Sequence, residues 1–411
     1  MPRYLTALIA FGILLAACQP STSPDEPSTI DVVPSTTQPE ADGGRDLIVV
    51  STIEGSVAVH DATGAEVSRI DPPSGSIFRQ PTWLDGATIV FSEVSDAGDH
   101  SLTAADAQAG EIVWRSAMDT PPFYFSPAPG GGAYATTSLR NDPSGAGLIA
   151  ELIDDAGSAS MLSDESPFYT SWSPGGDSLA IHIVGQRLDI WTPHETETIA
   201  SDAALFQTPV WVEKGLVTLR IVDDSQRLTV WDNGSFTDLA TVDGPVGFVA
   251  SGDLVAIQAT ERPDAGSIAA GLRTQTIPTI PGGKLVVLDR STRTLHTVSN
   301  DLALLYQWSQ NGESLLYATV ADEPLSLEWH VWSSVETSPT DAFILQPPWF
   351  QSLVPFFDQY AQSVQFWSAS GDHIAYPAVV DEEPVVVIQP VDGSDLTTIS
   401  GATWTAWAPP G

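Results

Sequence analysis

The sequence is poor in cysteine and in lysine. Cys18 is the only cysteine among 411 residues, so the chain cannot form an internal disulfide. Lysine occurs only at Lys214 and Lys284, and 52 acidic residues give a formal net charge of −37. Such a charge disfavours nucleic acid and anionic lipid surfaces as partners. The acidic excess fits either a solubility adaptation, which we favour, or the binding of a cationic partner.

The sequence also lacks an apolar run long enough to cross a bilayer as a helix, which needs roughly 20 residues. The apolar stretch Tyr4–Leu15 is shorter, follows Arg3, and precedes small residues. This pattern predicts a secretory signal peptide over residues 1–17. The end of the stretch, Leu15-Ala16-Ala17-Cys18, resembles the bacterial lipobox, and the resemblance implies a lipidated Cys18. The alternative is an ordinary signal peptide with an incidental cysteine.

Residues 18–45 are rich in Pro, Ser, Thr and acidic residues and show no apolar periodicity. Such a composition cannot bury a core, so it predicts a flexible tether after the lipidated Cys18. The folded domain is expected over residues 46–411. The predicted location is the periplasmic or extracellular face of a bacterial membrane, held there by the lipid alone.

Recognised catalytic patterns are missing as well. No Gly-x-Ser-x-Gly sequence occurs, and the "HETET" stretch from His194 lacks the second histidine of a zinc peptidase. The histidines show no repeated spacing that would place them in one ring. We therefore assign no catalytic residue, no metal ligand and no cofactor.

What the sequence does contain is a repeat in which an aromatic residue precedes a turn and an apolar run. Its intervals mostly lie near the roughly 40–45 residues of a four-stranded propeller blade. Alternating runs separated by Gly, Asn or Asp follow within each unit, which indicates strands and hairpins. The units begin "WLDGATIVF" at Trp83, "FSPAPGGGAYAT" at Phe125, "WSPGGDSLAIH" at Trp172, "WVEKGLVTLR" at Trp211, "FVASGDLVAIQ" at Phe248, "WSQNGESLLYA" at Trp308 and "WSASGDHIAYP" at Trp367.

The two ends of the folded domain complement each other. Residues 407–411, "WAPPG", match the start of a further unit, and the runs from Asp46, Gly55 and Ala65 match its later strands. The sequence therefore predicts an all-β propeller of eight four-stranded blades, whose ring is closed by strands from both termini. Seven blades are the alternative, if the unit at Phe248 forms no blade.

The turns "WSPGG", "FSPAP", "WSQNG" and "WSASG" resemble the TolB-type propeller repeat. The resemblance covers nearly all of residues 46–411 and implies a β-propeller without a particular activity. One unit, "AADAQAGEIVWR" at Ala104–Arg115, resembles the repeat of quinone-dependent propeller enzymes. A single such unit leaves quinone chemistry as the lesser alternative.

Two connections are longer than the others. The first, Glu261–Gly283, is expected to be a surface loop. The second, Gln346–Gln362, is dense in aromatic residues, and these are the candidate partner-binding residues: Trp349, Phe350, Phe356, Phe357 and Tyr360. The alternative is that this segment buries its own aromatic side chains as a cap on the propeller.

The sequence thus predicts a lipid-anchored, non-enzymatic binding or scaffold protein of the cell envelope. Its partner would be an envelope protein, a peptide or a glycan. The alternative is an enzyme with its site in the central channel, for example a quinone-dependent oxidoreductase.

Overall fold

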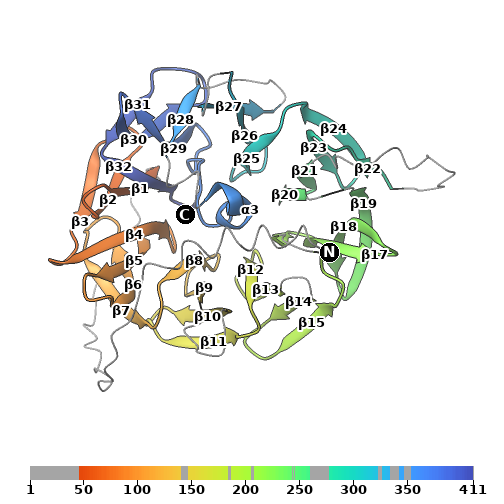
Figure 1. Cartoon of the computed structure of the whole chain (residues 1–411), viewed down its shortest axis with the longest axis horizontal. Coiled ribbons are helices and arrows are strands. Elements are labelled where there is room, and N and C mark those ends of the chain that lie inside the picture. Colours follow the sequence, from red (N-terminus) through yellow and green to blue (C-terminus); the bar gives the residue numbers. More distant parts are fainter. Residues whose placement is uncertain are drawn as a thin grey trace, which may run out of the picture.

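The strands form radial sheets around a common centre, and the chain runs once around this ring (Figure 1). The structure, a computed structural model, describes residues 46–139, 147–183, 187–204, 208–242, 244, 246–259, 277–322, 326–333, 342–346 and 353–410. Trp349, Phe350 and Cys18 lie outside the described residues. Within the described residues no helix is long and apolar enough to span a membrane.

Each sheet is built from strands that follow one another in sequence and pair antiparallel. The strands nearest the centre are β4 (Ser76–Trp83), β8 (Pro122–Pro127), β12 (Pro167–Trp172), β16 (Val210–Val212), β20 (Val246–Ser251), β25 (Ala303–Trp308) and β32 (Ala402–Trp407). Next come β1 (Leu47–Thr52), β5 (Thr88–Ser95), β9 (Ala133–Leu139), β13 (Leu179–Ile183), β17 (Gly215–Val222), β21 (Leu254–Ala259), β26 (Leu315–Val320) and β29 (His373–Val380). These second strands are largely buried, because each sheet packs between two neighbouring sheets.

The outer half of each sheet is more polar and more exposed. The third strands are β2 (Val57–Asp61), β6 (His100–Asp106), β10 (Leu148–Asp154), β14 (Arg187–Trp191), β18 (Ser225–Asp232), β23 (Lys284–Asp289), β27 (Ser326–Trp332) and β30 (Glu383–Pro390). The outermost are β3 (Glu66–Ile70), β7 (Ile112–Met118), β11 (Ala159–Ser163), β15 (Thr196–Ala200), β19 (Ser235–Val242), β24 (Thr294–Ser299), β28 (Phe343–Leu345) and β31 (Thr397–Ser400).

The two ends of the described chain meet in one sheet. Strand β32 pairs antiparallel with β1, with Ile48 opposite Trp407 and Val50 opposite Thr405. The sheet order is β3-β2-β1-β32, so the last strand of the chain supplies the innermost strand of the sheet that the first strands begin. The pairing expected between the final residues and the run from Asp46 is therefore present.

Two sheets depart from the simple repeat. The unit at Phe248 forms a regular four-stranded sheet, β20-β21-β23-β24. The strands β25 to β31 join into one seven-stranded sheet, because β28 pairs with β29. In place of an innermost strand before β29, the structure has an isolated bridge between Trp367 and Ile374.

Repeated tryptophans link neighbouring sheets at the inner strands. Their rings are buried, and the indole N–H donates to a backbone carbonyl of the preceding inner strand or segment. The bonds join Trp83 to Ala406 (2.9 Å), Trp172 to Ser126 (3.0 Å), Trp308 to Val249 (3.3 Å) and Trp367 to Gln307 (3.1 Å). Each contributes on the order of 1 kcal/mol beyond the burial of the ring.

The glycine four residues after such a tryptophan is required where sheets meet closely. Gly176 has a φ of +70°, and a Cβ there would overlap the carbonyl oxygen of Pro129 in the preceding unit. Gly312 has a φ of +72° and would overlap the hydroxyl of Ser251. Gly371 has the same kind of φ, +77°, but open space around it. The turn "WSPGG" is therefore both a hairpin connection and a contact between units.

The connection Glu261–Gly283 was expected to be a surface loop, and its described part contains a strand. Strand β22 (Thr279–Ile280) pairs in parallel with β19, the outermost strand of the preceding sheet. A segment inserted in one sheet thus covers the edge of its neighbour.

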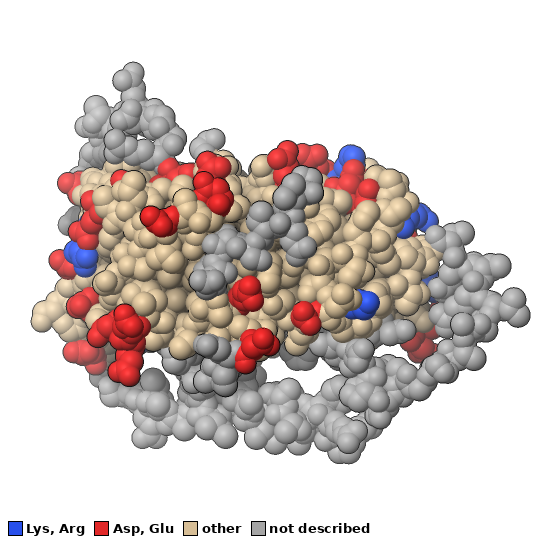
Figure 2. All heavy atoms as spheres, turned by 90° about the horizontal axis from the view of Figure 1, so that it is seen from above, with Lys and Arg blue, Asp and Glu red and all other residues tan. Residues whose placement is uncertain are grey.

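Acidic side chains are scattered over the face seen in Figure 2, with few basic ones among them. Asp223, Asp224, Asp381 and Glu382 lie in hairpin turns with positive φ. These carboxylates are spread over separate turns, so the negative charge of the sequence does not converge on one visible site.

Candidate functional site: the central channel

A short helical segment fills the middle of the ring. The 3-10 helix η1 (Val354–Phe356) runs directly into α3 (Phe357–Tyr360), which lies at the centre of Figure 1. Residues 353–366, which we call the channel plug, bury Leu353, Val364 and Phe366. The rings of Phe357 and Phe366 stack with centroids 5.6 Å apart. The plug is therefore an apolar core for the channel.

Amide side chains hold the plug against inner strands. Gln359 accepts from the backbone N–H of Thr170 (3.1 Å) and donates to its carbonyl (3.2 Å), as a neighbouring strand would. From the opposite direction, Gln307 on β25 accepts from the backbone N–H of Phe366 (2.8 Å). The Gln307 amide also donates to two carbonyls of the plug. These bonds satisfy backbone groups that would otherwise be buried without partners.

Hydroxyl groups add two further links on the side of β4 and β8. The Tyr360 hydroxyl donates to the carbonyl of Phe123 (2.5 Å), and Thr82 donates to that of Ser363 (2.5 Å). Tyr360 also meets the ring of Tyr124 edge to face, at 5.5 Å. The plug is thus bonded to inner strands all along one side of the channel.

The candidate aromatic residues that the structure describes belong to this plug. Phe357 and Tyr360 are buried, with exposed fractions of 3% and 8%, and Phe356 is half-buried. They pack as the cap alternative expects, although partner binding by this segment stays a prediction. The structure therefore offers Phe356 more readily than Tyr360 to a partner.

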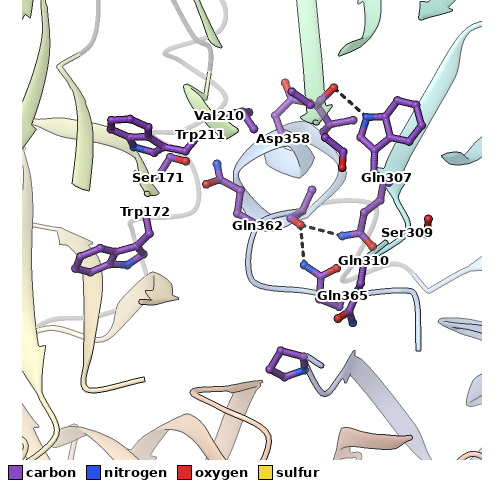
Figure 3. Close-up of a pocket in the computed structure, with 16 residues that line it drawn as sticks. Ser171, Trp172, Val210, Trp211, Gln307, Ser309, Gln310, Asp358, Gln362 and Gln365 are labelled. Atoms are coloured by element: carbon purple, nitrogen blue, oxygen red, sulfur yellow. Dashed lines mark hydrogen bonds between the residues drawn. The ribbon is translucent and has the colours of Figure 1, made fainter. Parts of the chain in front are cut away.

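A cavity of about 310 Å³ remains beside the plug, at the inner ends of β12, β16, β20 and β25. Figure 3 shows Gln362 extending from the plug toward Ser171 and Trp211 across this space. Tryptophan, glutamine and serine side chains dominate the lining. The lining residues are Ser171, Trp172, Val210, Trp211, Val249, Ala250, Ser251, Gln307, Trp308, Ser309, Gln310, Asp358, Ala361, Gln362, Gln365 and Pro409.

Three polar atoms of this lining have no hydrogen-bond partner within the described structure. They are the indole Nε1 of Trp211, the amide Nε2 of Gln362 and the amide Oε1 of Gln310. Trp211 occupies the repeat position at which other tryptophans bond to the preceding inner strand. Since an unpaired buried polar atom costs about 1–3 kcal/mol, the hydrogen bonding around the cavity is less complete than at the junctions where the indole is bonded.

Asp358 is the carboxylate of the cavity. Its Oδ1 accepts from the hydroxyl of Tyr306 (3.2 Å), and Gly247 leaves room for the pair, since a Cβ there would overlap both groups. Burial raises the pKa of Asp358 from 3.8 to about 6, against a lowering by the Tyr306 hydrogen bond. The carboxyl group can therefore exist in either protonation state near neutral pH.

His182, a fully buried histidine, has a structural role. His182 lies with Nε2 2.9 Å from the carbonyl oxygen of Ala204, and burial lowers its pKa to about 4. Within the described ranges no group of three or more His, Cys, Asp and Glu side chains could hold a metal ion. Trp114, from the unit that resembles quinone-dependent enzymes, packs edge to face on Tyr134 at 5.7 Å, between sheets.

The sequence reasoning missed Asp358, Gln310 and Gln362, although two of them lie in the segment chosen for its aromatic residues. A signal was present at Gln307, which directly precedes the aromatic residue of its unit. The corresponding positions in two other units carry the smaller Thr82 and Ser171. A long amide side chain at the end of an inner strand indicates that the channel contains backbone groups to which it can hydrogen-bond.

Radial four-stranded sheets around a filled channel define a β-propeller, and the predicted all-β propeller fold is confirmed. No family model and no curated protein matches the chain. Among solved structures, it is similar to the dihydro-heme d1 dehydrogenase NirN in complex with DHE. That match has 12% identity and a TM-score of 0.58, and covers 99% of this chain and 85% of that one.

Two further matches have lower TM-scores. One comes from a study of two prolyl endopeptidases, with 10% identity, a TM-score of 0.50 and coverage of 82% of this chain and 50% of that one. The other is TolB from Acinetobacter baumannii, with 10% identity, a TM-score of 0.39 and coverage of 82% of each chain. At such identities the likeness concerns the fold alone, and these propellers differ in function.

Proposed function

We propose that this chain is an exported, lipid-anchored propeller of the bacterial cell envelope that binds a protein, peptide or glycan partner without transforming it. The observation that carries the proposal is the channel cavity with its lining of tryptophan, glutamine and serine side chains. A concave site with a few convergent polar groups is the usual form of a ligand site. We further propose that the segment Gln346–Gln362, with Trp349, Phe350, Phe356, Phe357 and Tyr360, borders this site.

The architecture of the proposal is a closed ring of eight blades. Its support is the sheet pattern, in which the seven-stranded sheet divides at the β28–β29 pairing into two units of the repeat. The pairing of β1 with β32 supports closure by both ends of the chain. In a closed ring, the sheet that contains both ends of the chain would be complete, so β1 would not be left as an unpaired edge.

The lipid anchor rests on the lipobox-like sequence that ends at Cys18. Mass spectrometry of the mature protein from its native membrane should find an acylated N-terminal Cys18. A mature chain that begins at another residue, without lipid, would remove the anchor from the proposal.

The raised pKa of Asp358 favours a second candidate, an enzyme that uses this carboxyl group as a general acid or base. Of the described residues that line the cavity, Asp358 alone is a carboxylate, and none is His, Cys, Lys or Arg. Glycoside hydrolysis, for comparison, ordinarily requires two carboxyl groups. The lining therefore supports binding better than turnover.

Partner capture tests the function directly. Full-length protein in detergent, crosslinked in native envelope extracts, should retain a partner that Trp211→Ala loses and Trp349→Ala weakens. Trp114→Ala is the matched control, because Trp114 packs between sheets away from the cavity. Equal capture by wild type and Trp211→Ala would show that the cavity is not the binding site.

A further inference from the structure

We infer that the channel cavity binds a neutral, hydroxyl-rich group, a single saccharide unit of a glycan. This inference rests on the proposed binding function and specifies the chemistry of its ligand. The argument uses the size, hydrogen-bonding groups, charge and aromatic surface of the lining.

The size of the cavity limits the ligand to a small group or to the end of a larger one. Its volume of about 310 Å³ lies at the lower limit of small-molecule sites, roughly 300–1,000 Å³. The plug closes its inner side through Asp358, Ala361 and Gln362. A chain can therefore place one terminal unit in the cavity, with the rest outside.

Amide, hydroxyl and indole groups dominate the polar side chains of the lining, so they fit a ligand that both donates and accepts. Trp211 Nε1 and Gln362 Nε2 are donors, whereas Gln310 Oε1 is an acceptor. A hydroxyl group is one donor and two acceptor sites on a single rotating atom, so adjacent hydroxyls satisfy such a mixed set. An ammonium group only donates, and would leave Trp211 and Gln362 unpaired.

The charge of the lining excludes anions. Asp358 is a lining residue, and no Lys or Arg is among the described lining residues. A phosphate or carboxylate there would lose its hydration without gaining a positive partner. Asp358 serves a hydroxyl in either protonation state, because its carboxylate accepts and its carboxylic acid donates.

Trp211 offers the apolar surface that the carbon-bound hydrogens of a sugar ring require. Trp211 is half-buried, and its ring packs edge to face on that of Trp231, with centroids 6.1 Å apart. Val210 and Ala250 extend the apolar surface beside it. A rigid aromatic side chain next to convergent amides combines both needs of such a ligand.

A peptide is the competing macromolecule, and strand addition is its usual mode of binding to a sheet. Of the four inner strands that reach the cavity, the one that carries Trp211, β16, has only three residues, so it offers few backbone groups for pairing. The unpaired atoms described above belong to side chains instead. These features favour the saccharide.

Isothermal calorimetry and tryptophan fluorescence on the detergent-solubilised full-length protein test the inference. The probes are glucose, galactose, N-acetylglucosamine and their disaccharides, with lysine amide as a cation and glucose 6-phosphate as an anion. We expect at least one neutral saccharide to bind more tightly than both charged probes. Trp211→Phe and Gln362→Leu, which each remove an unpaired donor, should weaken that binding at least ten-fold.

Matched controls separate the site from the fold. Trp114→Phe and Gln108→Leu make the same chemical changes away from the cavity and should keep wild-type affinity. The inference is overturned if no neutral saccharide binds at tens of millimolar, if lysine amide binds more tightly, or if the cavity variants behave as their controls. Capture of an envelope protein that still depends on Trp211 would then uphold the proposed function without the saccharide.

Discussion

Two neighbouring junctions of the ring use the same residue type differently. Between β8 and β12, Trp172 is buried and its indole N–H donates to the carbonyl of Ser126 at 3.0 Å. Between β12 and β16, Trp211 occupies the equivalent position, but its indole nitrogen has no partner within the described structure and the cavity lies beside it. Trp172 lines the cavity as well, so the two residues differ in the inter-sheet hydrogen bond, which Trp172 makes and Trp211 lacks.

The difference shows where a repeat protein can place a site at little cost to its stability. A tryptophan that donates across a junction links two sheets, so a change there disturbs both of them. At the Trp211 junction that bond is absent and a cavity lies beside the ring. Four predictions test this contrast between junctions, from the largest expected effect to the smallest.

Removal of residues 402–410 should have the largest effect, because it deletes β32 from its sheet and exposes β1. We expect loss of most of a stability that is typically about 5–15 kcal/mol. Thermal unfolding followed by circular dichroism measures it. Truncation after Ala408 is the control, since it leaves β32 intact; a similar melting temperature for both truncations would contradict the role of this junction.

Gly176→Ala should destabilise by about 2–4 kcal/mol, because it combines a positive φ with overlap on the preceding unit. Gly371→Ala, at the same turn position but in open space, should cost only about 1 kcal/mol. Urea unfolding midpoints give both values. If the two variants are equally destabilised, the turn glycine is required by its backbone angle alone.

Asp358→Asn should stabilise the protein by about 1–3 kcal/mol at pH 7 and by little near pH 4. Burial raises the folded pKa of this acid from 3.8 to about 6, so the folded state binds the proton more tightly than the unfolded chain. The wild type therefore loses stability as the pH rises from about 4 to about 6, relative to the variant.

The free energy of unfolding of wild type and variant, measured at several pH values, gives this difference. The contributions of the other carboxylates are the same in both proteins and cancel. The groups packed near Asp358 are Tyr306 and Tyr169, and burial raises the pKa of both. Neither tyrosine titrates between pH 4 and 6, so the window belongs to Asp358. A constant difference between the proteins across that range would contradict the raised pKa.

Trp172→Phe and Trp211→Phe compare the two junctions most directly. The first removes the donor of the bond to the Ser126 carbonyl, so we expect a loss of about 1–2 kcal/mol. The second removes a donor that is already unpaired, so stability should change by less than about 0.5 kcal/mol. Equal losses in urea unfolding would mean that the two junctions do not differ.

The sheets could be predicted from the sequence because each unit repeats its aromatic residue, its turn and its alternating runs. Even the pairing of the two chain ends follows from a unit that is divided between residues 46–70 and 402–411. The described aromatic residues of Gln346–Gln362 pack in the channel, because burial there removes their apolar surface from water.

The cavity could not be predicted, because it depends on what the plug fails to fill. Gln362 and Gln310 have ordinary sequence surroundings, and only the three-dimensional ring brings them near Trp211. The strand β22 is a similar case, since two residues of a long connection carry no periodic signal of their own. The sequence therefore predicts the contacts within a unit, but not the contacts between units.

The position of the plug also constrains the order in which the chain can fold. Thr82, Phe123 and Thr170 bond to residues 359–363, so the inner strands of the early units wait for a segment made much later. Such contacts between distant residues raise the contact order and slow folding, because long loops must close first. During synthesis from the amino end, the early sheets can form their hairpins, but their inner strands cannot yet make their contacts with the plug. The partly synthesised protein would then be an incomplete ring whose channel is filled with water instead of the plug. Its exposed apolar surfaces would make it a substrate for chaperones.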